Sequence, residues 1–118
     1  MRMLPVYRIT VFVPPTHVDE LIAGIITVDD LALGDYSEVM WIARGGEERF
    51  RPGIEARPAL GAAGELTRAS TVRIEFAIPR DAARLERVLS EGVHRHHPWE
   101  VPAVFVDESI FPLPDGIE

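Results

Sequence analysis

The stretch His96-His97-Pro98-Trp99-Glu100-Val101-Pro102 decides how the last third of the chain folds. The segment before it has helical periodicity, because one stripe holds its apolar and small residues, Leu85, Val88, Leu89, Gly92 and Val93. Asp81 suits the N-cap of this helix, and Pro98 ends it. The short apolar run 103–106 that follows predicts a strand packed against helices.

Alternating apolar residues predict two further strands. The clearest covers 72–78, where Val72, Ile74, Phe76 and Ile78 alternate with more polar residues and Pro79 closes the run. The same period of two predicts a strand over 7–13, closed by Pro14 and Pro15. Thr16 and Asp19 then resemble a capping box, and the apolar spacing of 18–25 predicts a helix.

A less regular region separates these two halves. Residues 36–43 have the β-branched and aromatic character of a strand, whereas 44–70 contain several Gly and Pro residues and no sustained period. So long a connection without structure is unusual, so we expect it to be functional, locally folded or held by a neighbour in an oligomer.

The predicted order is strand, helix, strand, strand, helix, strand. This order predicts an α+β fold, the ferredoxin-like split β-α-β sandwich (βαββαβ), with an antiparallel sheet and two helices on one face. We expect residues 1–118 to form this single domain. The opposite face would carry Phe12 and either Trp41 or Ile42, and we expect a copy of the same sheet to cover them.

Composition narrows the function. The 118 residues include 12 basic and 19 acidic side chains, giving a formal net charge of −7, so we expect neither nucleic acid nor a membrane surface as a partner. The absence of cysteine excludes disulfides and thiolate chemistry. No segment has the roughly 20 apolar residues of a membrane span, and a cytoplasmic location is the expectation.

Several short motifs resemble the ferredoxin-like insert domain of the YqfO, NIF-three-like proteins and, more distantly, the CutA and PII-like proteins. They are spread over most of the chain: Gly34-Asp35-Tyr36-Ser37, Phe50-Arg51-Pro52-Gly53, Ala56-Arg57-Pro58, Gly64-Glu65-Leu66 and His97-Pro98-Trp99-Glu100. Asp35 replaces the usual Asn of the insert, and Glu100-Val101-Pro102 is closer to the CutA pattern. The resemblance implies the fold and a homo-oligomer, either a trimer, as in CutA proteins, or a dimer. We expect no counterpart here of the dimetal core that flanks the insert in YqfO proteins, so we do not carry over its metal chemistry.

The His-rich helix end offers a candidate metal site. His94 and His97 share a helical face and, with Glu100, would supply two nitrogens and one oxygen to a divalent metal such as zinc or copper(II). The alternative is a solvated helix end with His97 hydrogen-bonded to backbone. We predict no required cofactor.

Four residues join His97 as candidates for a ligand site or a subunit interface. Trp99 and Glu100 suit either a subunit contact or a plug within the chain. Arg51, with Arg49 and Arg57, suits a small anionic ligand, since PII-like proteins bind nucleotides between subunits; the alternative is salt bridges to nearby glutamates. Tyr36 lies in the turn that the resemblance marks.

No motif indicates catalysis. Ser37, His97 and Asp35 have the residue types of a triad, but no nucleophile-elbow pattern surrounds Ser37, and Asp29-Asp30 predicts a solvated loop. We therefore expect a non-enzymatic, homo-oligomeric module that senses a small ligand or binds a protein, with the 44–70 connection and the 97–102 turn meeting at a subunit cleft. The alternative is a CutA-like protein that binds divalent metal.

Overall fold

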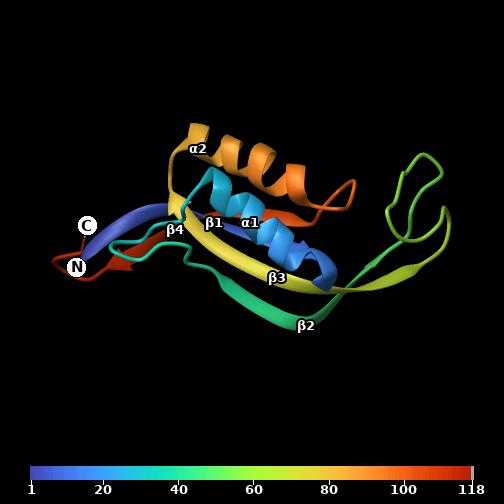
Figure 1. Ribbon diagram of the computed structural model, residues 1–118, viewed down its shortest axis with the longest axis horizontal. Coiled ribbons are helices and arrows are strands. Elements are labelled where there is room, and N and C mark those ends of the chain that lie inside the picture. The colour runs from blue at the N-terminus through green and yellow to red at the C-terminus, as the bar shows by residue number, and fades with distance from the viewer. Residues whose placement is uncertain (118) are drawn as a thin grey trace.

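The computed structural model describes residues 1–117. Four strands, two α-helices, a short 3-10 helix and a π-helical segment alternate along the chain. In order they are β1 (Arg2–Val13), η1 (Pro15–His17), α1 (Val18–Val28), β2 (Trp41–Phe50), β3 (Thr67–Pro79), α2 (Ala82–Arg87), η2 (Val88–His94) and β4 (Val104–Leu113). Since α2 runs directly into η2, the two form one continuous coil (Figure 1).

The four strands form one sheet in the order β2-β3-β1-β4. Every neighbouring pair is antiparallel, and both helical segments cover the same face of the sheet (Figure 1). Each strand-helix-strand unit therefore places its two strands on either side of a strand from the other unit. This arrangement confirms the predicted α+β, ferredoxin-like fold.

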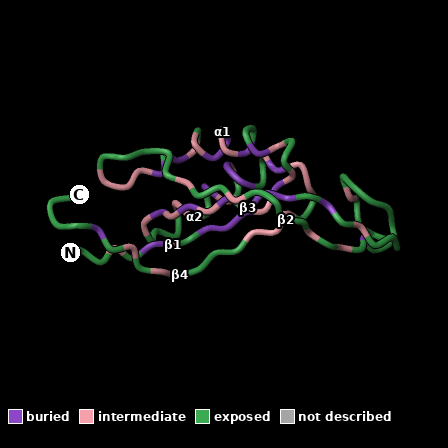
Figure 2. The backbone as a smooth tube through the Cα atoms, turned by 90° about the horizontal axis from the view of Figure 1, so that it is seen from below, coloured by how far each residue is buried: buried purple, intermediate pink, exposed green. Residues whose placement is uncertain are grey.

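The core lies between the sheet and the helices. The alternating residues of β1 and β3 that face the helices, such as Val11 and Ile74, are fully buried against α1 residues such as Leu21 and Ile25 (Figure 2). The alternation of apolar residues in the sequence therefore predicted correctly which face of these strands is buried.

The second strand begins and ends later in the chain than the sequence predicted. It begins at Trp41 rather than at residue 36 and continues to Phe50. Residues 33–36 instead form a tight turn in which the backbone N–H groups of Leu33 and Tyr36 donate to each other's carbonyls, and Leu31 and Glu38 have positive φ. These local hydrogen bonds and left-handed positions take the segment out of the sheet.

The irregular connection is shorter than predicted because β2 and β3 form a long hairpin arm. A bulge between Ala43 and Gly46 shifts the register, after which residues 46–50 pair with 67–71. Gly45 has φ +96°, a conformation that favours glycine, so the Gly-Gly pair bends the strand rather than ending it. Only residues 51–66 lie outside regular structure at the arm's tip.

The two predicted helix caps differ in outcome. Asp81 caps α2 as predicted, since its carboxylate accepts a hydrogen bond of 3.1 Å from the backbone N–H of Arg84. The capping box at Thr16 is wrong, because Thr16 lies inside η1 and its hydroxyl is 2.9 Å from Nδ1 of His17. The two prolines favour a 3-10 turn before α1, and this turn moves the helix start to Val18.

Two glycines let the helices approach closely. A Cβ atom on Gly24 of α1 would lie 2.3 Å from Cγ of His96, and one on Gly92 of η2 would lie 3.3 Å from the Cα of Ile25. Nδ1 of His96 also lies 2.9 Å from the carbonyl oxygen of Gly92. This close packing sets the position from which the 97–102 turn leaves the helix.

The prediction that Asp29-Asp30 marks a solvated loop is wrong for Asp29. Its side chain is 3% exposed and accepts two hydrogen bonds from the Arg84 guanidinium, at 2.5 and 2.8 Å. It also accepts from the backbone N–H of Leu31 at 2.9 Å. The Arg84 hydrogen bond holds the pKa of Asp29 below its ordinary value, against the opposing effect of burial. The pair ties the end of α1 to α2, a contact between distant residues that local composition does not reveal.

Candidate ligand-binding site

His97 holds the turn that follows η2. It is 8% exposed, and its two ring nitrogens have different partners. Nε2 lies 2.7 Å from the carbonyl oxygen of Phe12 on β1, and the backbone N–H of Trp99 donates to Nδ1 at 3.1 Å. A carbonyl can only accept, and an N–H can only donate, so His97 is the neutral tautomer with its proton on Nε2.

The electrostatic surroundings of His97 agree with this tautomer. Burial lowers the pKa of His97 below its ordinary value, although the hydrogen bond to Phe12 opposes this effect and the charges of His94 and His17 add to it. The imidazole is therefore uncharged at neutral pH and acts as a bridge between β1 and Trp99.

Trp99 packs against the hairpin arm. Its ring centroid lies 5.5 Å from that of Phe50, the last residue of β2, and 5.8 Å from that of His97. The next residue, Glu100, accepts a hydrogen bond of 2.9 Å from the backbone N–H of Arg57 in the connection. The 97–102 turn and the 51–66 connection therefore meet, and they do so within one chain.

The base of the connection is closed by Arg51. Its guanidinium donates to the carbonyl oxygen of Gly64 at 2.5 Å, and the backbone N–H of Gly64 donates to the carbonyl of Pro52 at 2.8 Å. Arg51 therefore pins the two ends of the connection together. The structure gives its side chain a structural role beside the site rather than a place in the cavity lining.

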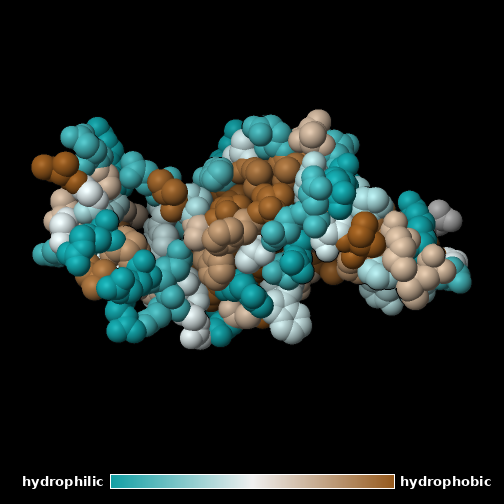
Figure 3. Space-filling model, turned by 180° about the vertical axis from the view of Figure 1, so that it is seen from behind, coloured by the Kyte–Doolittle hydropathy of each residue, from teal (hydrophilic) through white to brown (hydrophobic). Residues whose placement is uncertain are grey.

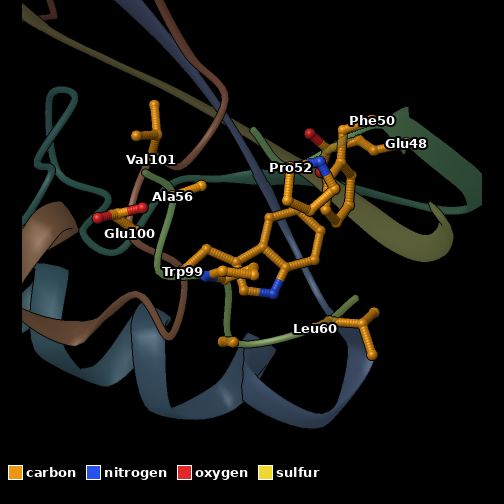
Figure 4. Close-up of a pocket in the computed structure, with 10 residues that line it drawn as sticks. Glu48, Phe50, Pro52, Ala56, Leu60, Trp99, Glu100 and Val101 are labelled. Carbon is orange, nitrogen blue, oxygen red and sulfur yellow. The ribbon is translucent and has the colours of Figure 1, made fainter. Parts of the chain in front are cut away.

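A cavity of about 230 Å³ lies where these segments meet. Figure 4 shows the Trp99 indole at its centre, with Phe50, Pro52 and Glu48 on one side and Glu100 and Val101 on the other. Most of its lining is apolar, and two carboxylates complete it: the residues are Glu48, Phe50, Pro52, Ala56, Pro58, Ala59, Leu60, Trp99, Glu100 and Val101. A mostly apolar hollow with a few polar groups is typical of a small-molecule site.

Glu48 is the unusual member of this lining. Burial raises the pKa of its carboxyl above the ordinary value, and a side-chain hydrogen bond with Thr71 has a smaller opposing effect on that pKa. Its Oε2 atom is buried, and within residues 1–117 it has no hydrogen-bond partner. The sequence pattern does not single out Glu48 as a site residue, and Phe50 stands out only as part of a motif. The alternation Glu48-Arg49-Phe50 was a sign that the strand continued, but Gly45-Gly46 concealed it.

Other candidate residues lie elsewhere. Tyr36 is 77% exposed and lines a second hollow with Asp35, Ser37 and residues of the C-terminal segment. This hollow is near the chain termini, and the 97–102 turn lies toward the other end of a molecule 54 Å long (Figure 1). The structure therefore does not bring Ser37 and Asp35 together with His97.

The three candidate metal ligands each have different surroundings. His97 uses both ring nitrogens within the protein, His94 is exposed, and Glu100 bonds the connection. In the described part of the chain, no three His, Asp or Glu side chains are grouped closely enough to hold a metal ion. Metal binding by His94, His97 and Glu100 remains a prediction.

The sheet face away from the helices carries exposed aromatic rings. Register places Trp41 opposite Glu75, Glu75 opposite Thr10 and Thr10 opposite Phe105, so one row crosses all four strands. Trp41 is 64% exposed and Phe105 is 60% exposed, and Phe105 meets Phe12 edge to face at 6.3 Å. Ile42 pairs with Ile74 on the helix side, so Trp41 is the β2 residue on this face.

Exposed apolar side chains extend along the edge strands. On β4 they include Val106, which pairs with Ile9 and therefore lies on the opposite face from Phe105, and Ile110 nearer the end of the strand. The view from behind shows hydrophobic side chains gathered near the middle of the molecule (Figure 3). We call the set Phe12, Trp41 and Phe105 the aromatic face.

No protein-family model matches the chain. Curated relatives do match it: a GTP cyclohydrolase 1 type 2 homolog of Mycobacterium leprae is 31% identical over 93 residues, which are 79% of this chain and 23% of that protein. A protein of the same name in Listeria monocytogenes is 28% identical over 103 residues, which are 86% of this chain and 26% of that protein. The chain thus spans about a quarter of the length of these relatives.

Solved structures agree with these matches. A Bacillus cereus protein related to NIF3 superposes with a TM-score of 0.71 and 27% identity over 92% of this chain and 27% of that one. The resemblance to NIF3-like proteins is confirmed. CutA1 from Oryza sativa shares the fold, with a TM-score of 0.61 and 20% identity over 91% of this chain and 82% of that one. The chain covers about a quarter of the NIF3-related protein and of the curated relatives, so the similarity is to one part of each of those longer proteins.

Among the described residues, no helix has the length and apolar character needed to cross a bilayer.

Proposed function

We propose that this chain is a non-catalytic module that binds a small ligand in the Trp99 cavity and assembles with copies of itself through the aromatic face. The observation that carries the first half is the meeting of the 51–66 connection with the 97–102 turn around a cavity of about 230 Å³. The connection bonds the turn through Arg57 and Glu100, so a ligand that fills the cavity would contact both segments.

The site is suited to sensing because its two walls differ in rigidity. The Trp99 wall is fixed by His97 to β1, deep in the sheet. The opposite wall is a connection at the tip of a hairpin arm, held by Arg51 and by the single hydrogen bond to Glu100. Binding would order the second wall against the first and so report ligand occupancy at the arm's tip.

The aromatic face supports the second half of the proposal. Phe12, Trp41 and Phe105 lie on the face that no helix within residues 1–117 covers, and two of the three are more than half exposed. Trp41 lies at one end of the row that crosses the sheet and Phe105, with Phe12, at the other, and aromatic side chains are enriched in protein interfaces. A second copy is the proposed occupant because the face would be equally exposed on each copy, so pairing buries both.

The relatives' name refers to a cyclohydrolase, but the chain covers only about a quarter of those proteins. The Trp99 cavity is lined by apolar side chains and two carboxylates, a set suited to holding a ligand. We therefore propose binding rather than catalysis for this chain.

A fragment screen by NMR tests the ligand-binding half. We expect at least one class of small aromatic fragment to bind saturably and to shift the Trp99 indole N–H signal. With binding followed by the backbone amide signals of the lining residues, since the variant lacks the indole, Trp99→Ala should abolish it, and Tyr36→Ala, which changes the hollow at the other end, should leave it unchanged. Binders that shift only residues 33–39, or no binder at all, would refute the cavity as the site.

Light scattering at several protein concentrations tests the assembly. We expect an oligomer for the unchanged chain and a monomer for the double variant Trp41→Lys with Phe105→Lys, with the circular dichroism spectrum retained. A matched double variant, Asp19→Lys with Glu20→Lys on the exposed side of α1, should remain oligomeric. A monodisperse monomer in the unchanged protein would refute this half.

A further inference from the structure

The charged residues that line the Trp99 cavity indicate the charge of the ligand it would bind. Its polar lining consists of two carboxylates, Glu48 and Glu100, which lie on opposite sides of the Trp99 ring (Figure 4). The whole chain has a formal net charge of −7, so the surrounding field has the same sign as the two carboxylates.

Of the two carboxylates, Glu48 should have the stronger effect on which ligand charge the cavity prefers. Its Oε2 atom is buried and has no partner within hydrogen-bond distance in residues 1–117, and a side-chain hydrogen bond of the carboxyl with Thr71 offsets only part of the effect of burial on its pKa. A buried carboxylate oxygen without a donor is costly, and it gains most from a charged donor brought close to it in a poorly solvated place. A cation in the cavity would lie beside this carboxyl and stabilise its charged form, which burial in the protein disfavours.

The apolar part of the lining favours a cation with a flat hydrocarbon body. The Trp99 and Phe50 rings lie 5.5 Å apart at their centroids, and aromatic faces attract cations in addition to burying apolar surface. A volume of about 230 Å³ lies below the roughly 300–1,000 Å³ of sites for drug-sized ligands, so the ligand is small.

The arginines of the connection do not reverse this preference. The Arg51 guanidinium is engaged with the carbonyl oxygen of Gly64, and Arg57 reaches Glu100 through its backbone. Neither residue is part of the cavity lining. The three arginines in or beside the connection made a small anion one candidate ligand in the sequence, with salt bridges as the alternative, whereas the folded lining presents carboxylates.

We infer that the Trp99 cavity selects a small organic cation, an ammonium or amidinium on an aromatic or other flat apolar body, with Glu48 as its charge partner. This inference rests on the proposed ligand-binding function and adds the chemical class of the ligand. It makes Glu48 the specificity-determining residue and Trp99 the platform on which the apolar body lies.

Three matched probes test the inference on the unchanged chain: phenethylammonium, 2-phenylethanol and 3-phenylpropionate, which share a phenyl ring and a short chain and differ in charge. Binding is followed by the shift of the Trp99 indole N–H in NMR titrations. We expect phenethylammonium to bind at least about tenfold more tightly than the alcohol, and the carboxylate to bind most weakly, since a hydrogen bond to a charged group is worth about a factor of ten or more.

Two glutamine variants locate the effect. Glu48→Gln keeps the shape of the side chain and removes its charge, and we expect it to weaken phenethylammonium at least about tenfold while leaving the alcohol nearly unchanged. Glu47→Gln is the control, because Glu47 is exposed, pairs with Arg68 and lies outside this lining. Circular dichroism and the melting temperature of both variants confirm that they fold.

The outcomes separate this inference from the proposed function. Equal affinity for the three probes, tighter binding of the carboxylate, or equal effects of Glu48→Gln and Glu47→Gln would overturn the cation inference. If the probes fail but other fragments shift Trp99, the cation inference is wrong and the ligand-binding function stands. If no fragment binds, both are wrong.

Discussion

Replacing His97 with alanine should destabilise the whole domain and disable the cavity together. The imidazole joins the Phe12 carbonyl on β1 to the Trp99 backbone N–H, at 2.7 and 3.1 Å, and is 8% exposed. Alanine removes both hydrogen bonds and leaves a donor and an acceptor without partners in a largely buried place. The turn would then lose the link that holds Trp99 against the arm.

The expected cost follows from these two bonds. Each lost hydrogen bond is worth about 1 kcal/mol net, and a buried group left unpaired costs about 1–3 kcal/mol. Partial solvent entry would relieve some of this, so we expect His97→Ala to lower the free energy of unfolding by about 2–4 kcal/mol. A domain of this size has a total stability of about 5–15 kcal/mol, and the melting temperature should fall by roughly 10 °C.

Urea unfolding followed by circular dichroism measures this cost, and two variants sharpen it. His97→Gln should recover part of the stability, because its side-chain amide can donate to the Phe12 carbonyl. His94→Ala changes an exposed residue three positions earlier and should stay within about 0.5 kcal/mol of the unchanged protein. A loss below 0.5 kcal/mol for His97→Ala, or losses of equal size at positions 94 and 97, would refute the bridging role.

The remaining predictions concern three other sites. Trp99→Ala should weaken phenethylammonium binding at least about tenfold and leave the oligomer unchanged in light scattering; conversion to monomer would instead place Trp99 in the subunit interface. Asp29 has a pKa held below its ordinary value of about 3.9 by Arg84, so its contribution to stability is complete above about pH 4 and is lost as the pH falls. Asp29→Asn should therefore flatten that part of the curve of unfolding free energy against pH between about pH 2 and 6, and an unchanged slope would contradict the assignment. Gly24→Ala should destabilise despite the advantage of about 1 kcal/mol that alanine has over glycine in a helix, because the new Cβ meets the His96 ring. In a His96→Ala background the same substitution should stabilise, and a loss of stability in both backgrounds would refute the packing argument.

The strands with one buried face were predictable because burial leaves a period of two in the residues themselves. Val72 to Ile78 and Tyr7 to Val13 carry that period, and both lie inside observed strands. The Asp81 cap was predictable for a similar reason, since the side chain bonds a backbone N–H three residues away. Both signals depend on neighbours close in sequence.

The start of β2 and the length of the hairpin arm were not predictable in this way. Most of β2 is exposed at the sheet edge, so no alternating burial marks it, and its glycine bulge resembles a break. The Asp29 and Arg84 pair joins residues 55 positions apart, and neither residue has a local pattern that announces the other.

For the candidate site too, some features follow from local sequence and others only from the tertiary structure. The amino-acid sequence alone determined the element order and the ferredoxin-like fold, because these depend on periodicity, and its short motifs made His97, Trp99 and Glu100 candidate site residues. Only the tertiary structure decided that the 51–66 connection meets the 97–102 turn within one chain, that Tyr36 lies apart from it, and that Glu48 faces the site. The physical reason is that the twist and bulge of the arm bring β2 to a turn about 50 residues later in the chain. Contacts of that separation depend on how the sheet is built as a whole.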